Sequence, residues 1–340
     1  MDNVRSATPG QVRRSPSVPA HWPIRRHVAA AETTPAGPLH SVEVTVPAKT
    51  NLTLHVGPAH EEWGGRHALD TIYCAIGVND VVTATAKTPG SGFSLELSGE
   101  HLGDLASSGS DMRRNHAVLA LFAIARAAGR EPDVALHVDK HIPVGAGLGG
   151  GSAAAATLLA VNTLWGLHWP IERLRDIAAT LGADMPFCLE GGYAHGTGFG
   201  ERIIPLEDDS SCVQTLRDRG FAGQLLVGAY HAQLSTPNVY STFDKMGAGD
   251  GDDNHLQRAA VALHPRSGEA IEVALAAGAS RSFVSGSGPS VIAFVPDDAV
   301  ARRVRTAWEQ SATVDRIIAA QAPARPVITV LPSLSYRVRQ

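Results

Sequence analysis

The sequence predicts an α+β protein built from two domains. Three features of its 340 residues support this prediction. Several short segments alternate apolar and polar residues, which is typical of strands buried on one face. A glycine-rich run over 143–152 stands between one such segment and an alanine-rich helical segment. Near residue 207 the pattern changes to a polar stretch, followed by a new succession of strand-like and helical segments. We therefore place the domain boundary there.

The first domain is predicted to cover residues 41–206 and to begin with strands. Val42, Val44 and Val46 alternate with polar residues, and the alternation resumes over 52–56 after a PAKTN segment. We interpret that segment as a bend between two strands or a bulge within one strand. The other strands are expected at 78–87, 92–98 and 134–142. The helices are expected at 115–128, 153–167 and 170–181, two of them ended by Gly129 and Gly182.

The second domain is predicted to cover residues 207–340 and to form one sheet with a helical layer. Its strands are expected at 224–230, 283–284 and 291–295, and a helix at 268–277. Residues 245–254 are mostly glycine and acidic residues, so we expect a mobile surface loop there. A metal site in that loop is the alternative.

Composition limits the possible partners and the compartment. A net charge of −4 argues against a nucleic-acid partner, which would favour a clustered basic face, and indicates a small-molecule substrate instead. No apolar run approaches the ~18 residues that span a bilayer, so we expect no membrane partner. Three cysteines without metal-ligand spacing suggest a reducing, cytoplasmic location, and no secretion signal is expected. Residues 1–40, rich in proline, serine, alanine and arginine, are predicted to be a disordered tail.

The glycine-rich run IPVGAGLGGGS at 142–152 is the segment that most directly predicts chemistry. A strand, a glycine loop and a helix start in this order direct free N–H groups and the positive end of a helix dipole at one point, which suits a phosphate. No Gly-Lys-Ser/Thr closes the run, so it is not a Walker A loop. Pro143 stiffens its entry, and Ser152 could cap the helix or reach a metal-bound phosphate. A tight structural turn is the alternative interpretation.

The motifs around this run resemble the superfamily of galactokinase, homoserine kinase, mevalonate kinase and phosphomevalonate kinase (GHMP kinases). Within it the resemblance is strongest to the 4-diphosphocytidyl-2-C-methylerythritol kinase family of the non-mevalonate isoprenoid pathway. The similarity covers about residues 42–335. Besides the glycine run, its motifs are PAKTNLTLHV at 47–56, RHALDT at 66–71, NTLWGL at 162–167, LGADMPF at 181–187, GTGFGE at 196–201, STPNVY at 235–240 and VSGSGP at 284–289.

The resemblance implies a two-domain GHMP kinase fold, with an N-terminal domain like domain 2 of ribosomal protein S5 and a ferredoxin-like α/β sandwich at the C-terminus. It also implies that ATP, with Mg²⁺, donates its γ-phosphoryl group to the 2-hydroxyl of the cytidine-diphosphate-linked methylerythritol. Phosphoryl transfer needs an oriented nucleophile and stabilised charge on the phosphate. Asp184 would orient or deprotonate the hydroxyl, and Lys49 would pair with Asp184 and offset the negative charge. Helix capping for Asp184 and a surface ion pair for Lys49 are the structural alternatives.

The same resemblance assigns the binding residues. The phosphates would lie on Pro143, Gly145, Gly147, Leu148, Gly149, Gly150, Gly151 and Ser152, and Ser152 is also the possible metal contact. The substrate would contact Asn51, Arg66, His67 and Tyr240. In the family a Tyr-His pair and an aromatic residue bind the cytosine. Here His67 and Tyr240 match, whereas Arg66 replaces the tyrosine of the pair. A guanidinium plane can still stack on a base.

Two further departures from the family pattern concern other segments. The helix after Ser152 has four alanines and is one residue shorter before Asn162, which would turn it by about 100°. The shift is absorbed either at the loop or farther along. His255 stands where the family has an acidic residue, which we interpret as surface variation. The alternatives to the assigned activity are a kinase of another small alcohol and a catalytically impaired sensor. His67 could also be an ordinary structural histidine.

Overall fold

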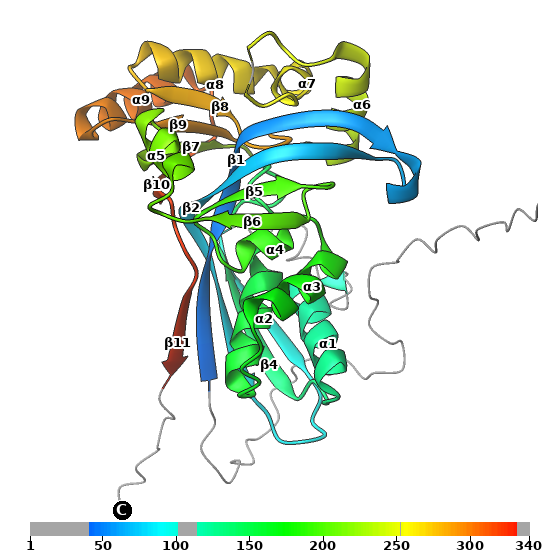
Figure 1. The fold of residues 1–340 in the computed structure, drawn as a ribbon. Coiled ribbons are helices and arrows are strands. Elements are labelled where there is room, and N and C mark those ends of the chain that lie inside the picture. Colours follow the sequence, from blue (N-terminus) through cyan, green and yellow to red (C-terminus); the bar gives the residue numbers. More distant parts are fainter. Residues whose placement is uncertain (1–40, 101–113, 252, 332–340) are drawn as a thin grey trace, which may run out of the picture.

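The computed structural model describes residues 41–100, 114–251 and 253–331, so the predicted tail at 1–40 lies outside the described residues. The fold is α+β, as the sequence predicts, and its strands form two sheets (Figure 1). The described helices are all too short or too polar to cross a membrane.

A long hairpin of β1 (Ser41–His60) and β2 (Arg66–Ala86) dominates the first sheet, and its far end curves away from the body of the molecule (Figure 1). The short helix η1 (Glu61–Trp63) connects the two strands. The strand order is β11-β1-β2-β4-β3, and β5 pairs with both β2 and β6. The remaining strands are β3 (Ser94–Gly99), β4 (Val134–Lys140), β5 (Tyr193–Thr197), β6 (Arg202–Leu206) and β11 (Val327–Leu331).

The PAKTN segment is a bulged part of β1, because the pairing with β2 shifts register at Pro47/Ala48 and again at Asn51/Thr53 while the strand continues. The predicted strand at 52–56 therefore belongs to β1, which runs on to His60. The first half of β2 was not predicted. Residues 73–76 are buried on both faces of the sheet, so no alternation marks them as a strand.

Four helices lie on one side of the first sheet: α1 (His116–Ala128), α2 (Ser152–Leu164), α3 (Ile171–Leu181) and the single-turn α4 (Met185–Cys188). The Asn115 side chain accepts from the Ala117 amide at the start of α1, and Gly129 ends this helix with a φ of 62°. α2 packs against β1 and β2, with α1 beside it. Residues 152–161 of α2 are all buried, and their alanines allow this close packing.

The second sheet has the order β10-β7-β9-β8. Its strands are β7 (Gly223–Ala229), β8 (Arg281–Val284), β9 (Val291–Phe294) and β10 (Arg316–Ala322). Its helices are α5 (Ser211–Asp218), α6 (Thr236–Met246), α7 (Gln257–Leu263), α8 (Pro265–Ala276) and α9 (Asp298–Ser311). α8 and α9 pack on this sheet. Trp308 of α9 is fully buried against α8 and the sheet.

Two predictions for the second half need correction. Residues 207–340 do not all belong to the second sheet, because β11 pairs antiparallel with β1 of the first sheet (Figure 1). The segment 245–254 is not a loop throughout. Lys245 and Met246 close helix α6, and Asn254 is buried, with its amide donating to the carbonyls of Val284 and Gly286 at 2.9 and 2.8 Å.

One hydrophobic cluster joins the two sheets. It contains Ala48, Leu52 and Ile76 of the long hairpin, and it contains Leu225 and Phe294 of the second sheet. Ile142, Ala146 and Leu148 of the glycine-rich segment belong to the same cluster. The glycine run is therefore fixed at the junction of the two sheets.

Candidate active site

Hydrogen bonds to its carbonyl groups hold the glycine run between the two sheets. The Leu148 carbonyl accepts from the Lys49 amide of β1 at 2.9 Å. From the other side, the Ser290 amide donates to the Ala146 carbonyl at 3.2 Å, and the Ser285 hydroxyl donates to the Gly147 carbonyl at 3.1 Å. Because these partners come from both sheets, the loop has a defined conformation without a bound ligand.

Two glycines of the run differ in whether the fold requires them. Gly147 has a φ of 78°, and a Cβ there would lie 2.1 Å from the Ser285 carbonyl oxygen, so close backbone contact excludes any side chain. Gly150 lacks a positive φ, and a Cβ there would meet no atom within 4 Å. The protein itself therefore needs glycine at 147 but not at 150. A tight turn explains the glycine at 147. It does not explain the glycine at 150, which close approach of a ligand to the backbone would explain.

A buried carboxylate anchors both ends of the glycine run. Asp80 of β2 accepts from the Ser152 hydroxyl at 2.5 Å, from the amides of His141 and Ile142 at 2.9 Å each, and from Lys140. Asp80 is fully buried, and the Lys140 charge compensates its own. Sequence reasoning missed both residues. The only signal was an acidic residue within an otherwise alternating strand segment.

The Asp80 contact gives the Ser152 side chain a partner within the protein. This residue is fully buried and lines neither cavity described below. Its hydrogen bond fixes the start of α2, and a phosphate or metal contact of Ser152 stays a prediction. A one-residue shortening of this helix would then be absorbed at its other end, where Asn162 exchanges hydrogen bonds of 3.3 and 3.1 Å with Trp169.

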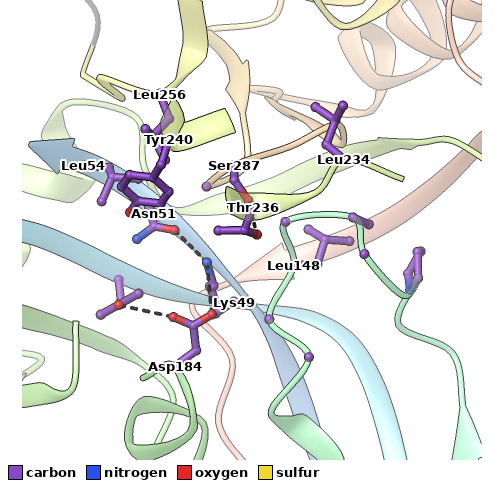
Figure 2. A pocket seen from close by; sticks show the side chains of 18 of the residues that line it. Lys49, Asn51, Leu54, Leu148, Asp184, Leu234, Thr236, Tyr240, Leu256 and Ser287 are labelled. Carbon is purple, nitrogen blue, oxygen red and sulfur yellow. Dashed lines mark hydrogen bonds and ion pairs between the residues drawn. The ribbon is translucent and has the colours of Figure 1, made fainter. Parts of the chain in front are cut away.

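Lys49 and Asp184 meet in front of the glycine run, as predicted, with 3.7 Å between Nζ and Oδ2 (Figure 2). Lys49 is buried with 7% of its side chain exposed, so it is not a surface ion-pair residue. Its Nζ also donates to Asn51 Oδ1 at 2.8 Å, and the Asn51 amide donates to Thr71 at 2.8 Å. Asn51, which was predicted to contact substrate, thus positions the Lys49 ammonium group.

Asp184 lies at the start of α4 without capping it, since no hydrogen bond joins its side chain to the helix amides. Besides Lys49, its neighbour is the Tyr73 hydroxyl, 3.4 Å from Oδ1. Burial raises the pKa of Tyr73 well above its usual value, and the negative charge of Asp184 adds to this effect. The phenol therefore stays neutral, and its one proton has two acceptors in reach, the carboxylate and the Gly200 carbonyl at 3.2 Å. The other oxygen of Asp184 faces Lys49 and the cavity.

Two adjoining cavities share Asp184. The first, of about 250 Å³, is lined by Lys49, Asn51, Tyr73 and by Pro143, Gly145, Gly147, Leu148, Gly149 and Gly150 of the glycine run. The second, of about 700 Å³, is lined by Arg66, His67, Tyr240, Gly150 and Gly151. Gly150, Leu69, Thr236 and Tyr240 also line both cavities. The structure therefore brings the predicted site residues together, except for Ser152.

His67 and Tyr240 form one unit in the second cavity. Their rings stack with centroids 5.3 Å apart and planes 23° apart. His67 Nδ1 lies 2.8 Å from the Gly57 carbonyl, and its Nε2 lies 3.2 Å from Asp244 Oδ1. Sequence reasoning missed Asp244, which follows Tyr240 by one helical turn on α6. Burial, and secondarily the Asp184 charge, raises the pKa of Tyr240 and keeps its phenol neutral.

Arg66 has a partner that the sequence did not reveal. Its guanidinium carbon lies 4.6 Å from the centre of the Phe199 ring, within the GTGFGE turn between β5 and β6. Phe199 also lines the second cavity, and the Trp63 ring contacts it edge-on at 6.0 Å. The stacking surface that we predict at Arg66 would therefore consist of the Arg66–Phe199 pair.

His255 is a structural contact, which corrects its interpretation as surface variation. Its Nδ1 accepts from the Val56 amide at 3.1 Å, and its ring lies 4.9 Å from His55 and stacks on Phe243. His255 therefore ties the segment before α7 to the outer part of β1.

Carboxylates are sparse in the site. Among the described residues, no group of three or more His, Cys, Asp or Glu side chains could hold a metal ion. Asp184 is the described carboxylate of the first cavity. Mg²⁺ is commonly held by one or two carboxylates together with substrate phosphates and water. The residues present are compatible with a metal that enters with a phosphate ligand.

Family models match both halves of the chain. The model described as "GHMP kinases N terminal domain" matches residues 115–192, and "GHMP kinases C terminal" matches residues 239–313. The solved structure of a 4-(cytidine 5'-diphospho)-2C-methyl-D-erythritol kinase superimposes with a TM-score of 0.62 at 29% identity, covering 83% of this chain and 99% of the other. Homoserine kinase from Cytophaga hutchinsonii gives 0.63 at 16% identity over 89% of this chain and 100% of its own, which shows the shared fold.

Curated relatives extend over most of the sequence. The 4-diphosphocytidyl-2-C-methyl-D-erythritol kinase of Bifidobacterium adolescentis is 72% identical over 86% of this chain and 95% of its own length. That of Streptomyces avermitilis is 39% identical over 86% of this chain and its full length. The fold, the order of the motifs and these identities place the chain in the GHMP kinase superfamily, as a member of the 4-diphosphocytidyl-2-C-methyl-D-erythritol kinase family.

Proposed function

We propose that this protein transfers the γ-phosphoryl group of ATP to the 2-hydroxyl of 4-diphosphocytidyl-2-C-methyl-D-erythritol, a step toward isoprenoid precursors. The names of its curated relatives support the substrate. The observation that carries the proposal is the Lys49–Asp184 ion pair, which lies where the cavity of the glycine run meets the cavity of His67 and Tyr240. A phosphate donor in the first cavity and a cytidyl acceptor in the second would meet at this pair.

Asp184 would act on the acceptor hydroxyl. With one oxygen held by Tyr73 and the other near Lys49, the carboxylate is oriented before substrate binds. It would accept the hydroxyl proton as the oxygen attacks phosphorus, a contribution typical of general bases. The Lys49 ammonium, held by Asn51, would stabilise the negative charge that spreads over the transferring phosphoryl oxygens.

The glycine run would bind the phosphates of ATP. Free amides at the start of α2 and the positive end of its dipole favour an anion there, and the bare backbone at Gly150 allows close approach. Mg²⁺, bound through phosphate oxygens and water, would neutralise charge on the phosphates. We further expect a cytoplasmic location and a small-molecule rather than nucleic-acid partner.

Two alternatives remain for the test to exclude: a kinase of another small alcohol, and a sensor that binds nucleotide without turnover. Purified protein with Mg²⁺-ATP should convert the cytidyl substrate to its 2-phosphate, followed by phosphorus NMR together with ADP release in a coupled assay. Equal ADP release with mevalonate or homoserine would favour the first alternative. Binding of ATP and the cytidyl substrate without ADP release would favour the second.

A further inference from the structure

We infer that Asn254 is a positioning residue, which orients the peptide between Gly286 and Ser287 so that the Ser287 amide donates to the phosphoryl group during its transfer. The inference rests on the proposed function, to which it adds a further hydrogen-bond donor. It also gives a role to a buried asparagine outside the two cavities, in the segment before α7.

The Asn254 side chain fixes the 284–289 segment. Asn254 is only 2% exposed. Its amide donates to the carbonyls of Val284 and Gly286 at 2.9 and 2.8 Å, and its Oδ1 accepts from the Leu256 amide at 3.0 Å. Because a side-chain amide carries two donors and an acceptor, it can satisfy all three main-chain groups at once. Asn254 therefore determines the direction in which the Gly286 carbonyl points.

The direction of this carbonyl determines where the next amide points. In a trans peptide the C=O and N–H groups point in opposite directions, so the Ser287 N–H points away from Asn254. Gly286 and Ser287 line the first cavity, whereas Asn254 does not. Within the described part of the chain, the amides of Gly286 and Ser287 donate to no protein group. The Ser287 amide is therefore a free donor beside the cavity.

This amide lies between Lys49 and the second cavity. A Cβ on Gly286 would lie 3.1 Å from Lys49 Nζ, so the turn passes directly beside the ammonium group. The Ser287 hydroxyl lies 3.0 Å from the Thr236 hydroxyl, and Thr236 lines both cavities. Figure 2 shows Lys49, Ser287 and Thr236 around the first cavity. The free amide is therefore close to the place where a phosphoryl group would pass from donor to acceptor.

A donor at this place acts on the transition state. The acceptor oxygen bonds to the γ-phosphorus while the bond to the ADP oxygen breaks, and the hydroxyl proton passes to Asp184. A main-chain amide that is already oriented stabilises the charge on the phosphoryl oxygens without reorganisation. Loss of this donor should therefore lower kcat and leave the binding of both substrates nearly unchanged.

The first comparison tests the amide itself. Ser287→Pro removes the N–H, and Ser287→Ala is its reference because both variants lack the hydroxyl. Ser287 is not among the described residues with a positive φ, so its backbone is compatible in sign with proline. Relative to Ser287→Ala, Ser287→Pro should lower kcat by about 10²-fold, the scale of one lost donor of this kind. The KM values for ATP and for the cytidyl substrate should stay nearly the same.

The second comparison tests whether Asn254 acts through that amide. Asn254→Ala should lower kcat by about 10-fold in the parent and cause no further loss in Ser287→Pro, where the donor is already missing. The matched control is Asn162→Ala. Asn162 exchanges two hydrogen bonds with the main chain of Trp169 and lines neither cavity, so its loss should affect the melting temperature and not kcat. Asn254→Ser replaces Asn254→Ala if the latter does not fold.

A probe that needs no turnover separates this inference from the proposed function. ADP with Mg²⁺ and aluminium fluoride, which mimics the transferring phosphoryl group, should bind less tightly to Ser287→Pro than to Ser287→Ala in calorimetry. Equal binding of the probe together with equal kcat overturns the inference, and so does a higher cytidyl KM at unchanged kcat. Additive losses in the double variant overturn the role of Asn254. A parent that binds the probe and does not phosphorylate the cytidyl substrate refutes the proposed function alone.

Discussion

The two cavities that meet at Asp184 are built from different materials. The first consists of main chain and buried charge: glycines fixed by hydrogen bonds from both sheets, with Lys49 only 7% exposed. The second adds side chains at the far end of the hairpin and on α6 to glycines of the run, and its Asp244 is 53% exposed. Buried groups that are each held by several contacts suit phosphoryl transfer, because this reaction is the same for every phosphate donor. Exposed side chains can be exchanged at low cost in stability, so they suit recognition of a particular acceptor.

The largest effect is expected at the shared residue. Asp184→Asn should lower kcat by ~10²-fold or more and leave ATP affinity nearly unchanged, because a general base contributes on that scale and does not bind the nucleotide. Single-turnover kinetics on parent and variant would measure the chemical step. The control is Asp70→Asn, at an exposed carboxylate that lines neither cavity. An unchanged rate would remove Asp184 from the reaction and leave the two cavities without a common catalytic residue.

Lys49→Ala tests whether the buried charge of the first cavity serves catalysis or folding. Loss of a preorganised cationic donor should reduce kcat by about 10²-fold. Thermal unfolding of the same variant separates the two roles. If the melting temperature falls while kcat is retained, Lys49 only balances the charge of Asp184.

The glycine run can be tested with one residue that the fold requires and one that it does not. Gly147→Ala should lower the melting temperature and ATP affinity together, because its Cβ would overlap the Ser285 carbonyl. Gly150→Ala should keep the parent melting temperature and weaken ATP binding in calorimetry. Parent-like ATP affinity in folded Gly150→Ala would mean that the phosphates do not approach the backbone there.

A smaller effect is expected at Arg66 in the second cavity. Arg66→Ala should raise the KM for the cytidyl substrate by the factor that corresponds to losing a base-stacking contact of ~1–3 kcal/mol. The KM for ATP should not change. Arg66→Tyr should retain binding, because it restores the residue that the family uses. Steady-state kinetics with both substrates measure the two constants. If neither substitution alters the cytidyl KM, the Arg66–Phe199 pair serves the hairpin and not the substrate.

The smallest effect is expected from thiol modification. Burial raises the pKa of Cys188 to about 12, with a further contribution from the Asp184 charge, and burial alone raises the pKa of Cys74 even more. Neither thiol forms thiolate near pH 8, whereas Cys212 is exposed. Iodoacetamide should therefore add one group per chain, at Cys212, with no loss of activity. Mass spectrometry that finds Cys188 labelled in the native protein would show that the region beside Asp184 opens.

Sequence and structure agree best where local pattern and local geometry coincide. The glycine run was predicted as a bared loop before a helix, and Gly129 as the residue that ends α1 in a left-handed conformation. Residues 73–76 of β2 were missed because burial on both faces removes the alternation that identifies a strand. His255 was misread because its partners, Val56 and Phe243, come from other elements.

The sequence by itself determined the fold class and the family, and it predicted that Lys49 and Asp184 lie together, because motifs of main-chain geometry and charge are kept in linear order. Only the tertiary structure decided what the side chains of these motifs contact. The Ser152 hydroxyl donates to the buried Asp80, and the Arg66 guanidinium lies over the Phe199 ring. The physical reason is that a hydrogen bond or stacking contact across 72 or more positions depends on how two sheets and their helices pack, which no local pattern encodes.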